Sequence, residues 1–279
     1  MFAYGDSFIY AGVDSKDYNV ILCSFDGEDD NSGNFGLERE IISEDFNGRL
    51  KKTHYGAKYT APLEFKITIV KNPCNNDRNY FIYDEIRDIN SWLTAYEFPQ
   101  KLYINSEYLH DVYFNAIFSN IEFRRINGEI VALTFTVTCD SPYAWEDFNR
   151  IYDCSSGETQ ITFYNNSDEK NKLFYPNIKI LSYSPTPQPI TIINTSTDDE
   201  NNKVIFKGVN ITETITMFGD NLQFISTENI SKYQNDVSNN NGYFNFEWLY
   251  MKSGKNILTV NGACQITISG AYPRKVGVN

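Results

Sequence analysis

Short runs in which every second residue is apolar recur along this chain, and they restrict its fold more than any other feature. The segment Leu63–Ile69 shows the pattern, with Leu63, Phe65, Ile67 and Ile69 on one parity and polar residues between them. Side chains of a β-strand point alternately to opposite faces, so the pattern is typical of a strand with one face on a core. The sequence therefore predicts a mostly β protein.

The strongest local prediction is a β-hairpin between Val112 and Cys139. Asn127-Gly128 at its centre is the pair that best tolerates the positive φ values of a type I′ turn. The alternating residues of its two arms are Ile117, Ser119, Ile121 and Phe123, followed by Val131, Leu133, Phe135 and Val137.

A single segment, 84–93, has the period of a helix. Ile86, Ile89 and Leu93 fall on one face, and Asp84 and Glu85 lie at the start, where the helix dipole favours acids.

The second half has no segment with a convincing helical period and consists of short alternating runs separated by polar or Gly/Pro-bearing loops. Many short strands with frequent turns predict a β-sandwich or jelly roll. The runs are Gln160–Tyr164, Asn177–Leu181, Pro189–Asn194, Lys203–Lys207, Asn256–Val260 and Gln265–Ser269.

Charge divides the chain near residue 150. Residues 1–150 hold 24 acidic and 14 basic residues, a net charge of −10, whereas residues 151–279 hold 12 and 10, a net charge of −2. We therefore expect two domains, 1–150 and 151–279.

Composition excludes several classes of protein. A net charge of −12 argues against a duplex-DNA binder, which needs a cationic face for the phosphates. There is no apolar run of about eighteen residues, so no membrane insertion is expected. The first residues lack a basic segment followed by an apolar one, so no signal peptide is expected. The five cysteines are scattered without a C-x-x-C pair, which predicts reduced thiols in a chain that folds in a cytoplasm.

No catalytic, cofactor or metal site is predicted. His54 and His110 lie outside any H-E-x-x-H pair or G-x-S-x-G elbow, and a structural or surface role is favoured for both. Glu38 and Glu40 share a strand parity, and two carboxylates are what a glycosidase needs. Such pairs occur in almost any acidic protein, so a solvated strand face is favoured.

Two aromatic groups are candidate contact sites. Tyr143, Trp145 and Phe148 form either a ligand platform or, as we favour, the packing between the two domains. Aromatic residues also alternate along 243–250, where one parity is expected to fill the core. The exposed ones could stack on sugar rings or on a neighbouring subunit, and Tyr243, Trp248 and Tyr250 are the candidates.

Motifs along nearly the whole chain resemble the distal tail proteins of long-tailed phages that infect Gram-positive bacteria. The most specific is the segment 133–144, LTFTVTCDSPYA, which closes the first domain as in that family. The others are Tyr4–Ser7, Glu38–Glu40 with Gly48-Arg49, Pro62–Val70, Trp92-Leu93, Tyr175–Ile180 and Leu249–Asn256.

The resemblance implies an N-terminal β-barrel-like domain with one helix and a protruding arm, followed by a C-terminal galectin-like sandwich. It implies a structural virion protein, not an enzyme. Six copies would form a ring at the tail tip that joins the tail tube protein to a tip or baseplate hub or adhesion protein. DNA would pass through the lumen without specific binding, and the ring would be assembled in the host cytoplasm.

Two further expectations follow from this resemblance. Residues 26–36, from Asp26 to Gly36, are polar and Gly-bearing, and they are the candidate for a flexible arm that clasps a neighbour. Part of the −10 excess of the first domain would line the channel and repel DNA phosphates. The alternative function is a carbohydrate-binding adhesion module that uses the exposed aromatics of the second domain, and a glycan array would distinguish the two.

Overall fold

The computed structural model describes residues 6–23, 39–74, 78–106, 109, 111–155, 157–228, 230–234 and 242–276. The chain divides into two compact units, each with its own apolar core. One comprises the residues up to Glu146 together with the chain from Arg274 onward, and the other spans Asp147–Pro273.

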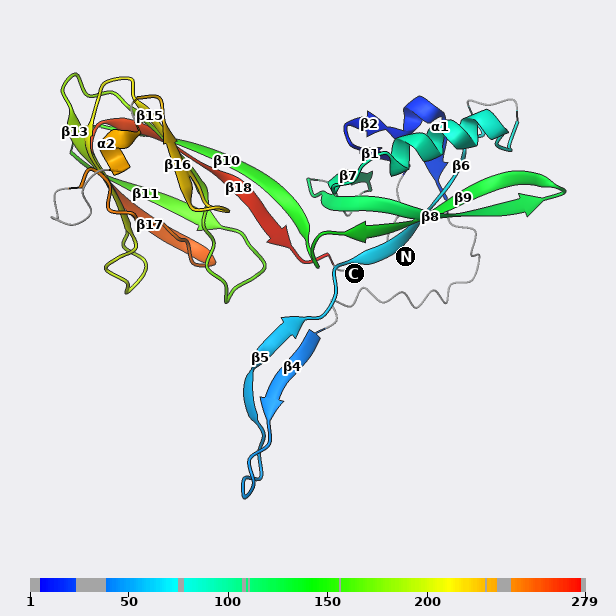
Figure 1. Ribbon diagram of the computed structural model, residues 1–279, viewed down its shortest axis with the longest axis horizontal. Helices are drawn as coiled ribbons and strands as arrows, with labels where there is room; N and C mark the ends of the chain where they lie inside the picture. The colour runs from blue at the N-terminus through cyan, green and yellow to red at the C-terminus, as the bar shows by residue number, and fades with distance from the viewer. Residues whose placement is uncertain are drawn as a thin grey trace. The chain divides into compact units, whose positions relative to one another are not determined.

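A seven-stranded antiparallel sheet forms the frame of the first unit, in the order β2-β1-β7-β8-β9-β6-β3 (Figure 1). The strands are β1 (Ser7–Tyr10), β2 (Val13–Asp14), β3 (Val20–Leu22), β6 (Glu64–Lys71), β7 (Gln100–Asn105), β8 (Phe114–Ile126) and β9 (Glu129–Cys139). The sheet does not close into a barrel among the described residues, because its outermost strands, β2 and β3, do not pair with each other. The expected mostly β fold is confirmed, and the domain expected to be barrel-like is an open sheet in the described residues.

The predicted hairpin is present as β8 and β9. Its turn residues Asn127 and Gly128 have φ values of 50° and 86°, as a type I′ turn requires. In the first half of β8 the buried residues are Phe114, Ala116 and Phe118, on the opposite parity to Ile117 and Ser119. A bulge between Ser119 and Ile121 changes the register there; beyond it Ile121 is half-buried and Phe123 is exposed.

The helix α1 (Tyr83–Thr94) matches the predicted segment and packs on the sheet through Ile89, Trp92 and Leu93. The Trp92 ring stacks on Phe8 at 5.5 Å and on Tyr18, in the short 3-10 helix η1 (Ser15–Tyr18), at 4.6 Å. Its indole N–H donates to the Tyr10 carbonyl at 3.3 Å, which ties the helix to β1.

Hydrogen bonds and ion pairs to the Glu85 carboxylate also hold the start of α1 in place. Glu85 accepts a hydrogen bond from the Ile82 backbone N–H at 3.0 Å and from the Nζ of Lys71, a buried residue at the end of β6, at 2.5 Å. Arg78 donates to the same carboxylate oxygen at 3.0 Å. Burial alone would raise the pKa of Glu85, but these donors and charges lower it below its usual value.

The second unit is a sandwich of two antiparallel sheets (Figure 1). One has the order β10-β18-β12-β15-β16 and the other the order β11-β17-β13-β14. The strands are β10 (Ala144–Cys154), β11 (Glu158–Asn165), β12 (Asn177–Ser182), β13 (Gln188–Asn194), β14 (Lys203–Val209), β15 (Thr214–Phe218), β16 (Gln223–Ser226), β17 (Gly254–Asn261) and β18 (Cys264–Arg274).

All six strands predicted for the second half are present, and each overlaps its predicted run. The sequence reading missed β10, β15 and β16, and it missed the one-turn helix α2 (Ser231–Gln234). The alternation predicted for the aromatic segment 243–250 is also corrected, because this segment contains no strand and only an isolated bridge at Phe244. Phe244 and Leu249, of opposite parity, are its buried residues, and Phe246 has a φ of 53° that interrupts any regular alternation.

Candidate interaction site

The strands β4 (Arg39–Glu44) and β5 (Thr53–Tyr59) form a hairpin that pairs with no other strand in the described part of the chain (Figure 1). The pairing runs from Arg39 opposite Tyr59 to Glu44 opposite Thr53, with a bulge after Ile42. Gly56, opposite Ile42, has a φ of 134°, a value that residues with a side chain rarely adopt. We call residues 39–59 the arm.

Contacts within the arm are polar and lie at the surface. Lys58 Nζ pairs with Glu40 at 2.9 Å, Lys52 Nζ pairs with Asp45 at 3.3 Å, and each of these four side chains is more than half exposed. Exposed ion pairs contribute at most about 1 kcal/mol each. The ion pairs therefore add little to the stability of the arm.

At the base of the arm, aromatic packing replaces ion pairing. The Arg39 guanidinium lies 4.5 Å from the centroid of the Tyr59 ring and donates to the Tyr59 hydroxyl. The Tyr59 ring in turn meets Tyr143 edge-on, with centroids 5.2 Å apart. Tyr143 is buried, so this contact links the arm to the body of the first unit.

Large apolar side chains are exposed along the rest of the arm. Ile41 is 65% exposed, Leu50 in the loop is fully exposed, and Ile42, Phe46 and Tyr55 are each at least 41% exposed. Single exposed apolar residues are ordinary, but a concentration of them on one element marks a contact surface. An isolated two-stranded hairpin is also at best marginally stable in water. Both observations indicate that the arm is built to pack against another surface.

Sequence reasoning identified the strand at Glu38–Glu40 but missed the arm as the exposed element. The segment that it proposed instead, from Asp26 to Gly36, lies outside the described residues, so its role stays a prediction. The sequence of β5, THYGAKY, does not reveal this exposure, because Tyr55, Ala57 and Tyr59 share one parity and alternate with His54, Gly56 and Lys58. Such alternation is typical of a strand with one buried face, yet residues 54–58 of β5 are all exposed.

The three aromatic residues predicted as a contact site do not form one cluster. Tyr143 and Trp145 belong to the first unit, where their rings meet at 6.4 Å and Trp145 bridges to the backbone of Tyr113. Phe148 lies in the core of the second unit and stacks on Tyr272 at 4.2 Å. All three serve as packing inside their own units, and a role toward a partner stays a prediction.

The candidates in the second unit have separate neighbours as well. Tyr243 is exposed and its ring covers Gly208, whereas Trp248 is half-buried with its ring edge-on to Phe244 at 5.5 Å. The Tyr250 hydroxyl donates to Asp199 at 2.9 Å. No described contact brings Tyr243, Trp248 and Tyr250 together, so a shared glycan platform also stays a prediction.

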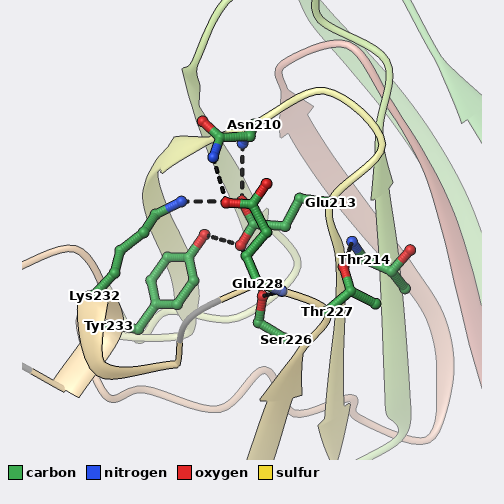
Figure 2. A network of polar contacts seen from close by, with 8 residues as sticks. All are labelled: Asn210, Glu213, Thr214, Ser226, Thr227, Glu228, Lys232 and Tyr233. Carbon is green, nitrogen blue, oxygen red and sulfur yellow. Dashed lines mark hydrogen bonds and ion pairs between the residues drawn. The ribbon is translucent and has the colours of Figure 1, made fainter.

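A polar network in the second unit surrounds the buried carboxylate of Glu213 (Figure 2). Its Oε1 accepts from the Tyr233 hydroxyl at 2.6 Å and from the Ser226 hydroxyl at 2.8 Å. Its Oε2 accepts from the Asn210 backbone N–H at 2.9 Å and from Lys232 Nζ at 3.0 Å.

These donors saturate the Glu213 carboxylate, so we assign it a structural role. Burial alone would raise its pKa, but the four hydrogen bonds together lower it below the usual value. The network fastens α2 and the end of β16 to the turn before β15.

The possibility of a metal centre or a membrane-spanning helix can be judged from the described residues. Within them, no three His, Cys, Asp or Glu side chains gather as a metal site would require. No helix in the described residues is long and apolar enough to cross a membrane. His54 lies exposed on the arm, and the side chain of His110 lies outside the described residues.

Comparison with known families accounts for both units. A family model described as the phage tail protein N-terminal domain matches residues 3–141, and a second, the phage tail C-terminal domain, matches residues 143–270. The chain belongs to this family of phage tail proteins. No curated protein matches the sequence.

A solved structure shows the same architecture. The crystal structure of the SPP1 Dit protein (gp 19.1) aligns with a TM-score of 0.65 over 95% of this chain and 98% of that one, at 11% identity. That protein is described as a paradigm of the hub adsorption apparatus of phages that infect Gram-positive bacteria. A chain of the activated phage P2 baseplate with calcium aligns with a TM-score of 0.49 over 94% and 97% of the two chains, at 10% identity. The resemblance seen in the sequence is thus confirmed as membership of a phage tail protein family and, through SPP1 Dit, in fold.

Proposed function

We propose that this phage tail protein forms a sixfold ring at the distal end of a long non-contractile tail and acts there as a structural adaptor. The observation that carries the proposal is the arm, an exposed apolar hairpin on a chain with the fold of SPP1 Dit. In this proposal residues 1–150 form the ring, and residues 151–279 are the galectin-like domain. The ring joins the tail tube protein to a tip or baseplate hub or adhesion protein.

The arm supplies the ring contact. In a closed ring, one surface of each subunit meets a different surface of the next, so each subunit must present a projection and a receiving surface. Burying Ile41, Ile42, Phe46, Leu50 and Tyr55 against a neighbour would remove apolar area from water and supply the stability that an isolated hairpin lacks.

The imaging of assembled particles tests the ring. The full chain should appear as sixfold rings with a central hole in negative-stain micrographs, and its mass in light scattering should be that of six copies. A monomer at every concentration reached would overturn the ring proposal.

Substitution on the arm tests the contact separately. The double variant Ile41→Ser/Leu50→Ser should shift the chain from rings to monomers while its circular dichroism stays that of the unsubstituted chain. Ile211→Ser is the matched control, because Ile211 is also half exposed but lies on a loop of the second unit. Rings that persist in the arm variant would show that the ring uses another contact.

The channel follows from the charge distribution. A basic lumen would hold DNA through counterion release, so a conduit is better lined with acids. The −10 excess of residues 1–150 can supply that lining. The electrostatic potential mapped on a reconstructed ring should be negative along the lumen, and a neutral or basic lumen would contradict this part of the proposal.

A further inference from the structure

Two of the five cysteines lie side by side in the second unit. Cys154 ends β10 and Cys264 begins β18, and these strands are neighbours in the five-stranded sheet. Both side chains are buried, with exposed fractions of 3% and 0%, and both thiols are free. The other three cysteines belong to the first unit.

Contacts on both faces of these strands bring the two thiols together. On the outer face, the Gln265 side-chain amide donates to Asp153 at 2.9 Å. Successive residues of a strand point to opposite faces, so the adjacent residues Cys154 and Cys264 meet on the core face. The two thiols are close enough there to shift each other's pKa, and the Cys264 thiol donates to the Gly262 carbonyl at 3.7 Å.

Neighbouring strands provide the spacing that a disulfide needs. Facing residues on paired antiparallel strands have Cα atoms about 4.5–5.5 Å apart. A disulfide spans Cα separations of about 4.4–6.8 Å, so the backbone need not move far to accommodate the bond.

We propose that Cys154 and Cys264 are a latent dithiol that closes into a disulfide when the chain meets a small-molecule disulfide in oxidising surroundings. The Cys154 thiolate attacks one sulfur of the small disulfide, forms a mixed disulfide and releases one small thiol. The Cys264 thiol then loses its proton to solvent, attacks the Cys154 sulfur and releases the second small thiol. Two protein thiols are oxidised, and one small disulfide is reduced to two thiols.

The local environment favours Cys154 as the attacking group. Interaction with the Cys264 side chain lowers the pKa of the Cys154 thiol, against the effects of burial and of the nearby Asp153 charge. The same interaction, together with burial, raises the pKa of Cys264. Because β10 is an edge strand of its sheet, its end can open to admit the oxidant without breaking a central strand.

The bond would staple the second unit at its ends, because β10 is its first strand and β18 its last. It would close a loop of more than a hundred residues, and long closed loops gain the most from a cross-link. We expect oxidation to raise the midpoint of thermal unfolding of this unit by roughly 5–15 °C.

Mass spectrometry on the intact chain tests the proposal. The reduced full chain is incubated with oxidised glutathione and sampled over time, and remaining thiols are alkylated in denaturant. The expected product carries a peptide cross-link between Cys154 and Cys264, shows the mass loss of two hydrogens and unfolds at a higher temperature.

Exposed Cys74 reports whether the oxidant is active, because it should form a mixed disulfide first. Buried Cys139, which has no thiol neighbour in the described residues, should stay reduced. The variant Cys264→Ala should abolish the cross-link, and peptide mapping of the unsubstituted chain decides the matter even if that variant does not fold. If both thiols stay free after Cys74 is consumed, or if the linkage joins other cysteines, the pair is only core packing and the proposal fails.

Discussion

Glu213 shows how one residue can fasten several segments of the second unit. Its carboxylate accepts hydrogen bonds from Tyr233 and Lys232 on α2, from Ser226 at the end of β16 and from the Asn210 backbone (Figure 2). Removing the charge would leave these donors without an ionised acceptor, and a buried hydrogen bond to a charged group is worth about 1.5–3 kcal/mol.

We expect Glu213→Gln to destabilise the second unit by about 2–4 kcal/mol at pH 7, because one amide cannot replace both carboxylate oxygens. The effect should depend on pH. The folded pKa of Glu213 is lowered, so its stabilisation is present above the unfolded pKa, about 4.3, and is lost as pH falls through the folded value. Thermal melts from pH 7 to pH 3 should show the gap between the two proteins narrowing, and a gap that stays constant with pH would contradict this account.

Gly219 is a position where only hydrogen fits. A Cβ built there would lie 1.9 Å from the Tyr175 carbonyl oxygen. The Gly219 backbone N–H donates to the side-chain oxygen of Asn177 at 2.9 Å. We expect Gly219→Ala to cost at least about 2 kcal/mol, because a backbone atom cannot move aside as a side chain would. Chemical denaturation measures this, with exposed Asp220→Ala as the control expected to stay within about 0.5 kcal/mol.

Elements differed in how far the sequence could predict them, and burial explains the difference. Strand β6 and helix α1 bury one face each, so their apolar periods could be read directly. Most of β8 and β9 was readable for the same reason, but the bulge at Asn120, which has a φ of 47°, changed the core face of β8 without any glycine to mark it. The arm was missed because its sequence does not reveal its exposure: β4 has no apolar alternation, whereas β5 alternates Tyr55, Ala57 and Tyr59 with His54, Gly56 and Lys58 and is exposed all the same.

The short edge elements were missed for related reasons. β16 has four residues and none of them is fully buried, so there is no alternation to detect. Helix α2 has a single turn and is held by the Glu213 network, a contact between distant segments that local spacing cannot show. The residues of the candidate site were therefore visible as residue types, but their grouping depended on tertiary contacts.

Glu85, at the start of α1, allows a test of how this helix is attached to strand β6. Lys71 is buried, and Glu85 is the acid paired with its Nζ in the structure. Glu85→Gln would leave the Lys71 charge without that carboxylate, and we expect a loss of about 3 kcal/mol from the first unit, measured by chemical denaturation. Asp84→Asn in the same turn is the matched control, since the Asp84 side chain is exposed, and it should change stability by less than about 1 kcal/mol. Equal effects of the two substitutions would show that the Lys71 pair does not anchor the helix.

For the whole molecule, the central feature is that two cores share one chain. The apolar cluster around Phe8, Trp92 and Phe135 contains no residue of the cluster around Phe163, Phe206 and Ile268. The chain crosses from one unit to the other twice, once along β10 and once at the end of β18. Separate cores are the condition under which domains unfold as separate cooperative units.

We therefore expect two unfolding transitions in calorimetry of the intact chain. The variants Glu85→Gln and Glu213→Gln show which transition belongs to which unit. Glu85→Gln should lower only the transition of the first unit, and Glu213→Gln only that of the second, because each carboxylate binds donors within its own unit. Oxidation of Cys154 and Cys264 should raise the same transition that Glu213→Gln lowers. If either variant moved both transitions equally, or if a single transition responded to both, the two units would be one cooperative body. The stability of the arm would then depend on the folding of the whole chain and not on the first unit alone.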